Sequence, residues 1–122
     1  MNHSGTEAKA LGALCAGVLG GTEKYAAFYH TVFADSTTDS PVAVSKLPEI
    51  AGTIGLDVDA WQACVDEKQT QDRFAQETAE AESLGLSGTP GNLILNKKTG
   101  AYIKISGAYP AATFTSAVAQ VQ

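Results

Sequence analysis

The chain has 122 residues, which is enough for one domain with a modest hydrophobic core. Its net charge of −5 comes from 13 acidic and 8 basic residues, and Lys97–Lys98 is the only adjacent basic pair. Partners such as nucleic acid or an acidic membrane require a clustered positive face, so this composition argues against both. No segment reaches the roughly 18 consecutive apolar residues of a transmembrane helix.

The N-terminus, Met1–Glu7, lacks the basic region and the uninterrupted hydrophobic core of a secretory signal. Two interpretations follow from this absence. As written, the protein stays in the cytoplasm, or its 122 residues are a piece of a longer polypeptide. The sequence alone leaves the compartment unknown and does not say whether Met1 is the native start.

The first third of the chain predicts two helices. Ser4 and Glu7 have the spacing of a capping box, in which each side chain satisfies a free backbone N–H at a helix start. Apolar residues then recur at helical spacing until Gly20–Gly21, which we expect to end the helix: Leu11, Leu14, Cys15 and Val18. A second helix follows and ends at the polar segment 35–41; its apolar side chains are Tyr25, Phe28, Tyr29, Val32 and Phe33.

Three further helices are predicted before residue 86. One covers residues 47–54, with Pro48 in its first turn, where the missing N–H costs nothing. Asp57 caps the next helix, whose inner side carries Trp61, Cys64 and Val65. Residues 68–84 form a polar helix with Phe74 as its clearest anchor to the core. We interpret the acidic residues of that helix as a solvated face rather than a metal site.

β character begins after Gly88. Segments 92–96 and 101–105 are rich in β-forming residues, and Lys97–Gly100 between them predicts a hairpin turn. Pro110 is expected in the first turn of a closing helix whose inner face carries Phe114, Val118 and Val121. A two-stranded hairpin is marginal in water, so other groups must cover its edges and faces.

Six segments of the chain occur in the order in which DsbA-like thiol-disulfide oxidoreductases carry their counterparts: Leu14–Gly17, Val32–Asp35, Leu47–Asp57, Ala60–Asp66, Leu84–Gly91 and Ile105–Phe114. The chain therefore resembles the later part of this family, which is a branch of the thioredoxin superfamily with a helical insertion. The resemblance implies a mainly helical α+β fold in a single domain, 1–122. Residues 1–86 would form the helical insertion region, and residues 87–122 the hairpin and C-terminal helix of an incomplete thioredoxin core.

The resemblance also implies a binding site and shows what is missing. Gly88, Thr89 and Pro90 match the family's cis-proline loop, which faces the catalytic cysteines and binds the backbone of a substrate. The family's opening strand, Cys-x-x-Cys helix and second strand have no counterpart in this sequence. The loop therefore either keeps a peptide-binding role or is purely structural, and we favour the structural interpretation. Family members are typically periplasmic or extracytoplasmic.

The two cysteines, Cys15 and Cys64, lie on the apolar faces of different predicted helices. Buried cysteines of this kind behave as small hydrophobic residues of low reactivity. Three interpretations stay open: a structural disulfide, as in related helical domains, two reduced buried cysteines, or a working redox pair. His3 and His30 have no metal-ligand spacing with the cysteines. We therefore predict no catalytic residue, no metal and no cofactor.

Three functions follow from these observations, and whether the chain is an enzyme stays undecided. The first is a truncated or degenerate DsbA-like domain without redox catalysis of its own. The alternatives are a peptide- or protein-binding module that uses the cis-proline groove, and a fragment of a full-length disulfide oxidoreductase. In the intact family fold another core strand pairs with Leu93, Ile94 and Leu95. Their free edge here predicts a homodimer through strand pairing or exchanged elements.

Overall fold

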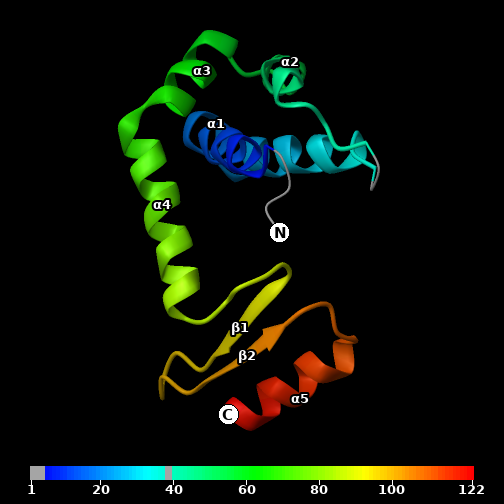
Figure 1. Ribbon diagram of the computed structural model, residues 1–122, viewed down its shortest axis with the longest axis vertical. Helices are drawn as coiled ribbons and strands as arrows, with labels where there is room; N and C mark the ends of the chain where they lie inside the picture. Colours follow the sequence, from blue (N-terminus) through cyan, green and yellow to red (C-terminus); the bar gives the residue numbers. More distant parts are fainter. Residues whose placement is uncertain (1–4, 38–39) are drawn as a thin grey trace. The chain divides into compact units, whose positions relative to one another are not determined.

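The computed structural model describes residues 5–37 and 40–122. These residues form five α-helices, the short 3-10 helix Val44–Lys46 and two β-strands (Figure 1). The expected mainly helical α+β class is thereby confirmed. The chain divides into two compact units, one extending to Gln76 and the other from Glu77 to Gln122. The predicted single-domain organisation stays a prediction, and the capping box predicted at Ser4 lies outside the described residues.

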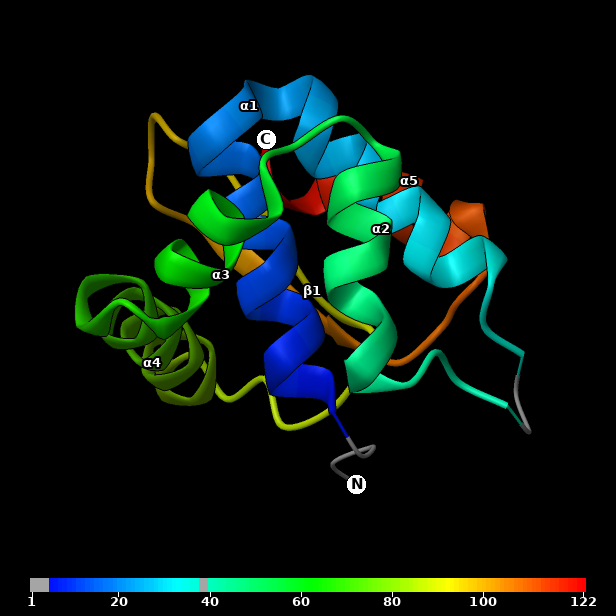
Figure 2. The ribbon, with the colours of Figure 1, turned by 90° about the horizontal axis from the view of Figure 1, so that it is seen from above.

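The first unit is built on helices α1 (Thr6–Ala34), α2 (Leu47–Thr53) and α3 (Val58–Asp66). Helices α2 and α3 both pack against α1, as Figure 2 shows from above. The predicted helix break appears as a kink inside α1, because Gly21 adopts φ 70° and ψ −169°. A positive φ is costly for residues with a Cβ, which explains why glycine stands at this position.

The core of the first unit consists of buried side chains from these helices: Ala13, Cys15, Ala16, Phe28, Val32, Leu47, Ile50, Ala51, Trp61 and Cys64. Phe28 and Trp61 are fully buried, and their rings stack with centroids 5.7 Å apart. Stacked aromatic pairs of this kind add to the free energy gained from burial. The predicted caps of the shorter helices are present, with Pro48 in the first turn of α2 and Asp57 accepting a hydrogen bond from the Ala60 N–H.

Helix α4 (Lys68–Ser83) is polar and mostly exposed, as expected. Its one buried residue, however, is Thr70, whereas Phe74 is only half-buried. The anchoring role of Phe74 stays a prediction, and Thr70 is a buried position that the prediction did not include. Apolar patterning points to aromatic side chains and gives no signal for a buried hydroxyl group.

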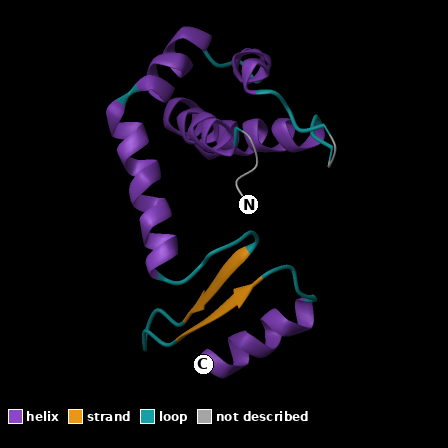
Figure 3. Ribbon diagram, in the orientation of Figure 1, coloured by secondary structure: helices purple, strands orange, loops and turns teal. Residues whose placement is uncertain are grey.

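The second unit contains an antiparallel hairpin of β1 (Gly91–Leu95) and β2 (Tyr102–Ser106), followed by α5 (Ala111–Val121) (Figure 3). The hairpin prediction is confirmed to within one residue. Two details of the closing helix differ. Pro110 has extended ψ 152° and precedes the helix as its N-cap. The inner positions of α5 are Ala117 and Val121, whereas Val118 is 42% exposed because its position lies about 100° further round the helix than Ala117.

Candidate functional site

The predicted site residues Gly88, Thr89 and Pro90 lie in the segment that connects the end of α4 to β1. Gly85 ends the helical segment with φ 72°, and the N–H of Leu86 reaches back to the carbonyl oxygen of Ala81 at 3.0 Å. This is the pattern of a helix C-terminal cap that turns the chain sharply. The Thr89–Pro90 peptide bond is cis, and the Pro90 carbonyl oxygen accepts a hydrogen bond from the Gly107 N–H at 2.8 Å. This hydrogen bond joins the end of the loop to the residue that follows β2.

The outer side of this loop is open. Gly88, Thr89 and Pro90 are all exposed, and a Cβ added to Gly88 would meet no atom within 4 Å. At Gly91, by contrast, a Cβ would lie 3.0 Å from the carbonyl oxygen of Gly88. The loop therefore packs closely against the start of β1 while its other side stays accessible to a ligand.

The pairing register determines which backbone groups of the hairpin are free. At one end of the hairpin, the Asn96 N–H donates a hydrogen bond to the Ala101 carbonyl oxygen. At the other end, the Gly107 N–H donates to the Pro90 carbonyl oxygen. Hydrogen-bonded and non-hydrogen-bonded pairs alternate along an antiparallel ladder. Asn92 and Ile94 therefore face β2, and the remaining residues direct their N–H and C=O groups outward: Gly91, Leu93 and Leu95 on β1, and Tyr102, Lys104 and Ser106 on β2.

Cys15 and Cys64 form a disulfide that links α1 to α3, with their Cα atoms 5.8 Å apart. Cys15 is completely buried and Cys64 is 8% exposed. The structure thus confirms the first of the three interpretations, a structural disulfide, and neither cysteine is a free thiol. Closing a loop over a sequence separation of 49 residues contributes about 4 kcal/mol to the free energy of unfolding in the chain-entropy description.

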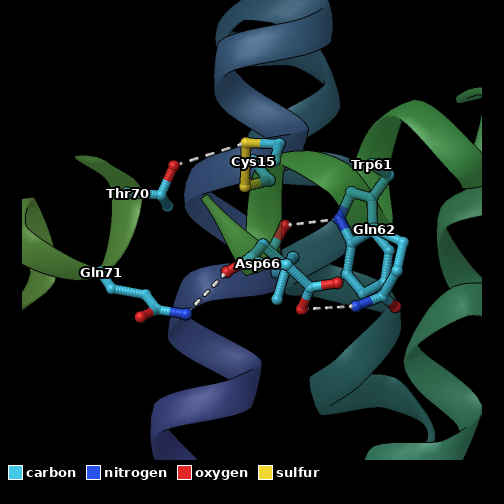
Figure 4. The surroundings of a disulfide bond; sticks show 9 residues. Cys15, Trp61, Gln62, Asp66, Thr70 and Gln71 are labelled. Atoms are coloured by element: carbon cyan, nitrogen blue, oxygen red, sulfur yellow. Dashed lines mark hydrogen bonds between the residues drawn. A yellow bond between two sulfur atoms is a disulfide. The ribbon is translucent and has the colours of Figure 1, made fainter. Parts of the chain in front are cut away.

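Thr70 is a member of the disulfide environment that sequence reasoning missed. Its Oγ1 lies 3.7 Å from Cys64 Sγ, and Figure 4 shows the hydroxyl group beside the disulfide. Because a disulfide sulfur carries no proton, the threonine hydroxyl is the donor of this weak hydrogen bond. The contact joins the first turn of α4 to the bond that links α1 and α3.

Within residues 5–37 and 40–122, no cluster of three or more His, Cys, Asp or Glu side chains could hold a metal ion. His30 is exposed on α1, and its ring meets the edge of Tyr29 with centroids 5.5 Å apart. None of the described helices is long and apolar enough to cross a membrane. The disulfide lies in the first unit and the Gly88–Pro90 loop in the second.

Comparison with known proteins agrees with the order of helices and strands described above. A family model described as a DSBA-like thioredoxin domain matches residues 2–119. A search of curated protein sequences found no match. Since the family match spans almost the whole chain, and the helices, hairpin and closing helix occur in the expected order, the chain belongs to the family of DSBA-like thioredoxin domains.

Proposed function

We propose that the chain is a DsbA-like domain, truncated or degenerate, that does not exchange disulfides by itself. The supporting observation is that its only two cysteines are joined in a buried disulfide. Thiol–disulfide exchange requires a thiolate that the substrate can reach, or a disulfide that an outside thiolate can attack. Cys15 is 0% exposed, and Cys64 is further shielded by its contact with Thr70.

An exchange assay tests this proposal directly. The purified chain is mixed with a fluorescent disulfide-bonded peptide and a thiol reductant, and the rate of exchange is compared with the rate in buffer alone. We expect no acceleration by the wild-type chain or by a Cys15→Ser/Cys64→Ser double variant. Acceleration that disappears in the double variant would overturn the proposal, because it would show that this pair is redox-active.

A second candidate function is peptide binding by Gly88, Thr89 and Pro90. It is supported by the exposure of all three residues and by the open space around Gly88. The matching loop in the family binds substrate backbone, and this part of the role requires no cysteine. We expect Pro90→Ala to weaken binding of an extended peptide and Ser87→Ala, in the same loop, to leave it unchanged. Equal affinities of the two variants would assign the loop a purely structural role.

We also propose that two copies associate through the outward edge of β1. The apolar run Leu93, Ile94 and Leu95 predicts this edge, but the register directs the backbone groups of Ile94 toward Ile103 of β2. The outward residues are Gly91, Leu93 and Leu95, which form a self-complementary set. A two-fold axis at Leu93 would place Leu93 opposite the partner's Leu93 and Gly91 opposite the partner's Leu95. All outward groups then pair, and β1 carries no charged side chain that would oppose this.

Sedimentation equilibrium tests this association. We expect the wild-type mass to approach that of a dimer as concentration rises. Leu93→Pro removes an outward N–H and should give a monomer. Lys104→Pro removes the equivalent N–H from the opposite edge of the hairpin and should leave the dimer intact. A wild-type monomer at every concentration, or identical masses for both variants, would exclude association through β1.

A further inference from the structure

A groove of about 450 Å³ lies between β2 and α5 within the second unit. Apolar side chains and polar side chains both line it: Ile103, Ile105, Ala117, Thr113, Ser116 and Gln120. Ile105 and Ala117 are buried, and the polar residues lie along one face of α5. Figure 3 shows α5 running back alongside the hairpin after the connecting loop. The groove therefore has a strand on one side and a helix on the other.

On the strand side of this groove, β2 has backbone N–H and C=O groups that do not pair with β1. The register directs the N–H and C=O groups of Tyr102, Lys104 and Ser106 away from β1, toward the free edge of β2. Alternating donors and acceptors on a free edge are what an incoming extended segment pairs with in β-augmentation. The spacing of these outward residues suits a segment of about five residues, with every second one hydrogen-bonded to β2.

The side chains around the groove indicate the chemistry of the segment. Among the described residues that line the groove, Lys104 is the only charged one, and a Cβ added to Gly85 would come within 2.7 Å of its Nζ. Its side chain also alternates with Ile103 and Ile105, which line the groove floor. The ammonium group is therefore directed away from the groove. Within the part of the chain that the structure describes, the side chains of Thr113, Ser116 and Gln120 make no hydrogen bond.

We propose that this groove binds an extended, uncharged polypeptide segment as a third strand on the free edge of β2. Side chains at alternate positions of the segment are apolar and rest on Ile103, Ile105 and Ala117. The positions between them are small and polar, and their side chains point to the opposite face of the sheet, as that of Lys104 does. This site is separate from the Gly88–Pro90 loop, and it does not depend on the redox properties proposed above.

Backbone hydrogen exchange, measured by NMR on the intact chain, tests the proposal. The probe is the capped peptide acetyl-Thr-Val-Thr-Val-Thr-amide at millimolar concentration. We expect exchange of the Tyr102, Lys104 and Ser106 amides to slow at least about tenfold, because these amides gain hydrogen-bond partners. Protection at Leu93 and Leu95 instead would place the peptide on the other edge of the hairpin. That result, or no protection at the β2 amides, would overturn the proposal.

Two matched pairs of variants separate strand addition from nonspecific binding. Lys104→Pro removes an outward N–H of β2 and should raise the peptide dissociation constant about tenfold or more. Leu93→Pro, at the opposite position on β1, should leave it unchanged. Ser116→Arg fills the groove from α5 and should block binding, whereas Thr115→Arg, outside the groove lining, should not. Equal affinity of Ser116→Arg and Thr115→Arg would also overturn the proposal, and circular dichroism of each variant verifies folding.

A modified peptide adds a test that leaves the protein unchanged. In an added strand only every second peptide N–H is directed at β2. N-methylation of the peptide residues whose N–H groups face β2 should therefore abolish binding, whereas N-methylation of the residues between them should preserve it. Equal loss of binding with both methylated peptides would show that the peptide does not pair as a strand.

Discussion

The indole N–H of Trp61 donates a hydrogen bond to the backbone carbonyl oxygen of Gly12 at 2.9 Å, across 49 residues of sequence. Gly12 lies on α1 and Trp61 on α3, and both are buried. An added Cβ at Gly12 would lie 2.8 Å from Trp61 Cζ2 and 2.8 Å from Phe28 Cζ. The missing side chain of Gly12 thus allows the two aromatic rings to pack directly against the backbone of α1.

Gly12→Ala should therefore destabilise the helical unit. Alanine favours helix formation over glycine, but the new methyl group must displace two rings in a packed core, at a cost of about 1–3 kcal/mol. Urea unfolding followed by the fluorescence of Trp61, the only tryptophan, measures the change. Gly88→Ala is the matched control, since an added Cβ there meets no atom within 4 Å. Equal stabilities of the two variants would contradict this account of the packing.

Loss of the Cys15–Cys64 disulfide should lower the free energy of unfolding more than Gly12→Ala does. We expect Cys15→Ser/Cys64→Ser to reduce the free energy of unfolding by about 4 kcal/mol, because the unfolded chain regains the freedom of a long loop. The same fluorescence experiment with and without reductant measures it. Under strongly reducing conditions the wild type should approach the double variant, and the double variant itself should not respond to reductant. A wild type that is equally stable with its cysteines reduced would show that the bond contributes little.

Asp57→Ala should cost about 1 kcal/mol, because the side-chain oxygen caps α3 by accepting the Ala60 N–H at 2.8 Å. Asp59 also lies in the first turn of α3, yet no capping hydrogen bond to its side chain occurs among the described residues. Asp59→Ala is therefore the control and should lose only the smaller interaction with the helix dipole. Thermal unfolding compares the two variants. A larger loss for Asp59→Ala would contradict the assigned cap.

Lys24→Met should loosen the contact between α1 and the end of α2. Lys24 Nζ donates a hydrogen bond to the Ile54 carbonyl oxygen at the C-terminus of α2, where a positive charge also favours the helix dipole. A Cβ on Gly20 would overlap the Lys24 side chain, so Gly20 leaves the space for this contact. We expect a loss of about 1 kcal/mol in urea unfolding. Lys97→Met, in the exposed hairpin turn, should be neutral, and a similar loss there would exclude a specific role for Lys24.

Local signals in the sequence were enough to predict most elements of the fold. Pro48, Asp57 and the Lys97–Gly100 turn act on their immediate neighbours, so the helix start, the helix cap and the hairpin were predicted correctly. The inner face of α5 was predicted less well. Val118 looked like a core residue because it is apolar, but the smaller Ala117 takes the buried position. Helical periodicity gives the approximate face, and packing against the hairpin selects the residues within it.

The sequence by itself determined the starts of α2 and α3, the hairpin and the absence of a Cys-x-x-Cys motif, because these depend on residues close together in the chain. The tertiary structure decided which of three states Cys15 and Cys64 adopt, since a disulfide requires two distant Cα atoms to come within bonding reach. It likewise brought Thr70 to the disulfide and Trp61 to Gly12. The free edges of β1 and β2 also depend on register, because a shift of one residue would exchange the outward and paired backbone groups.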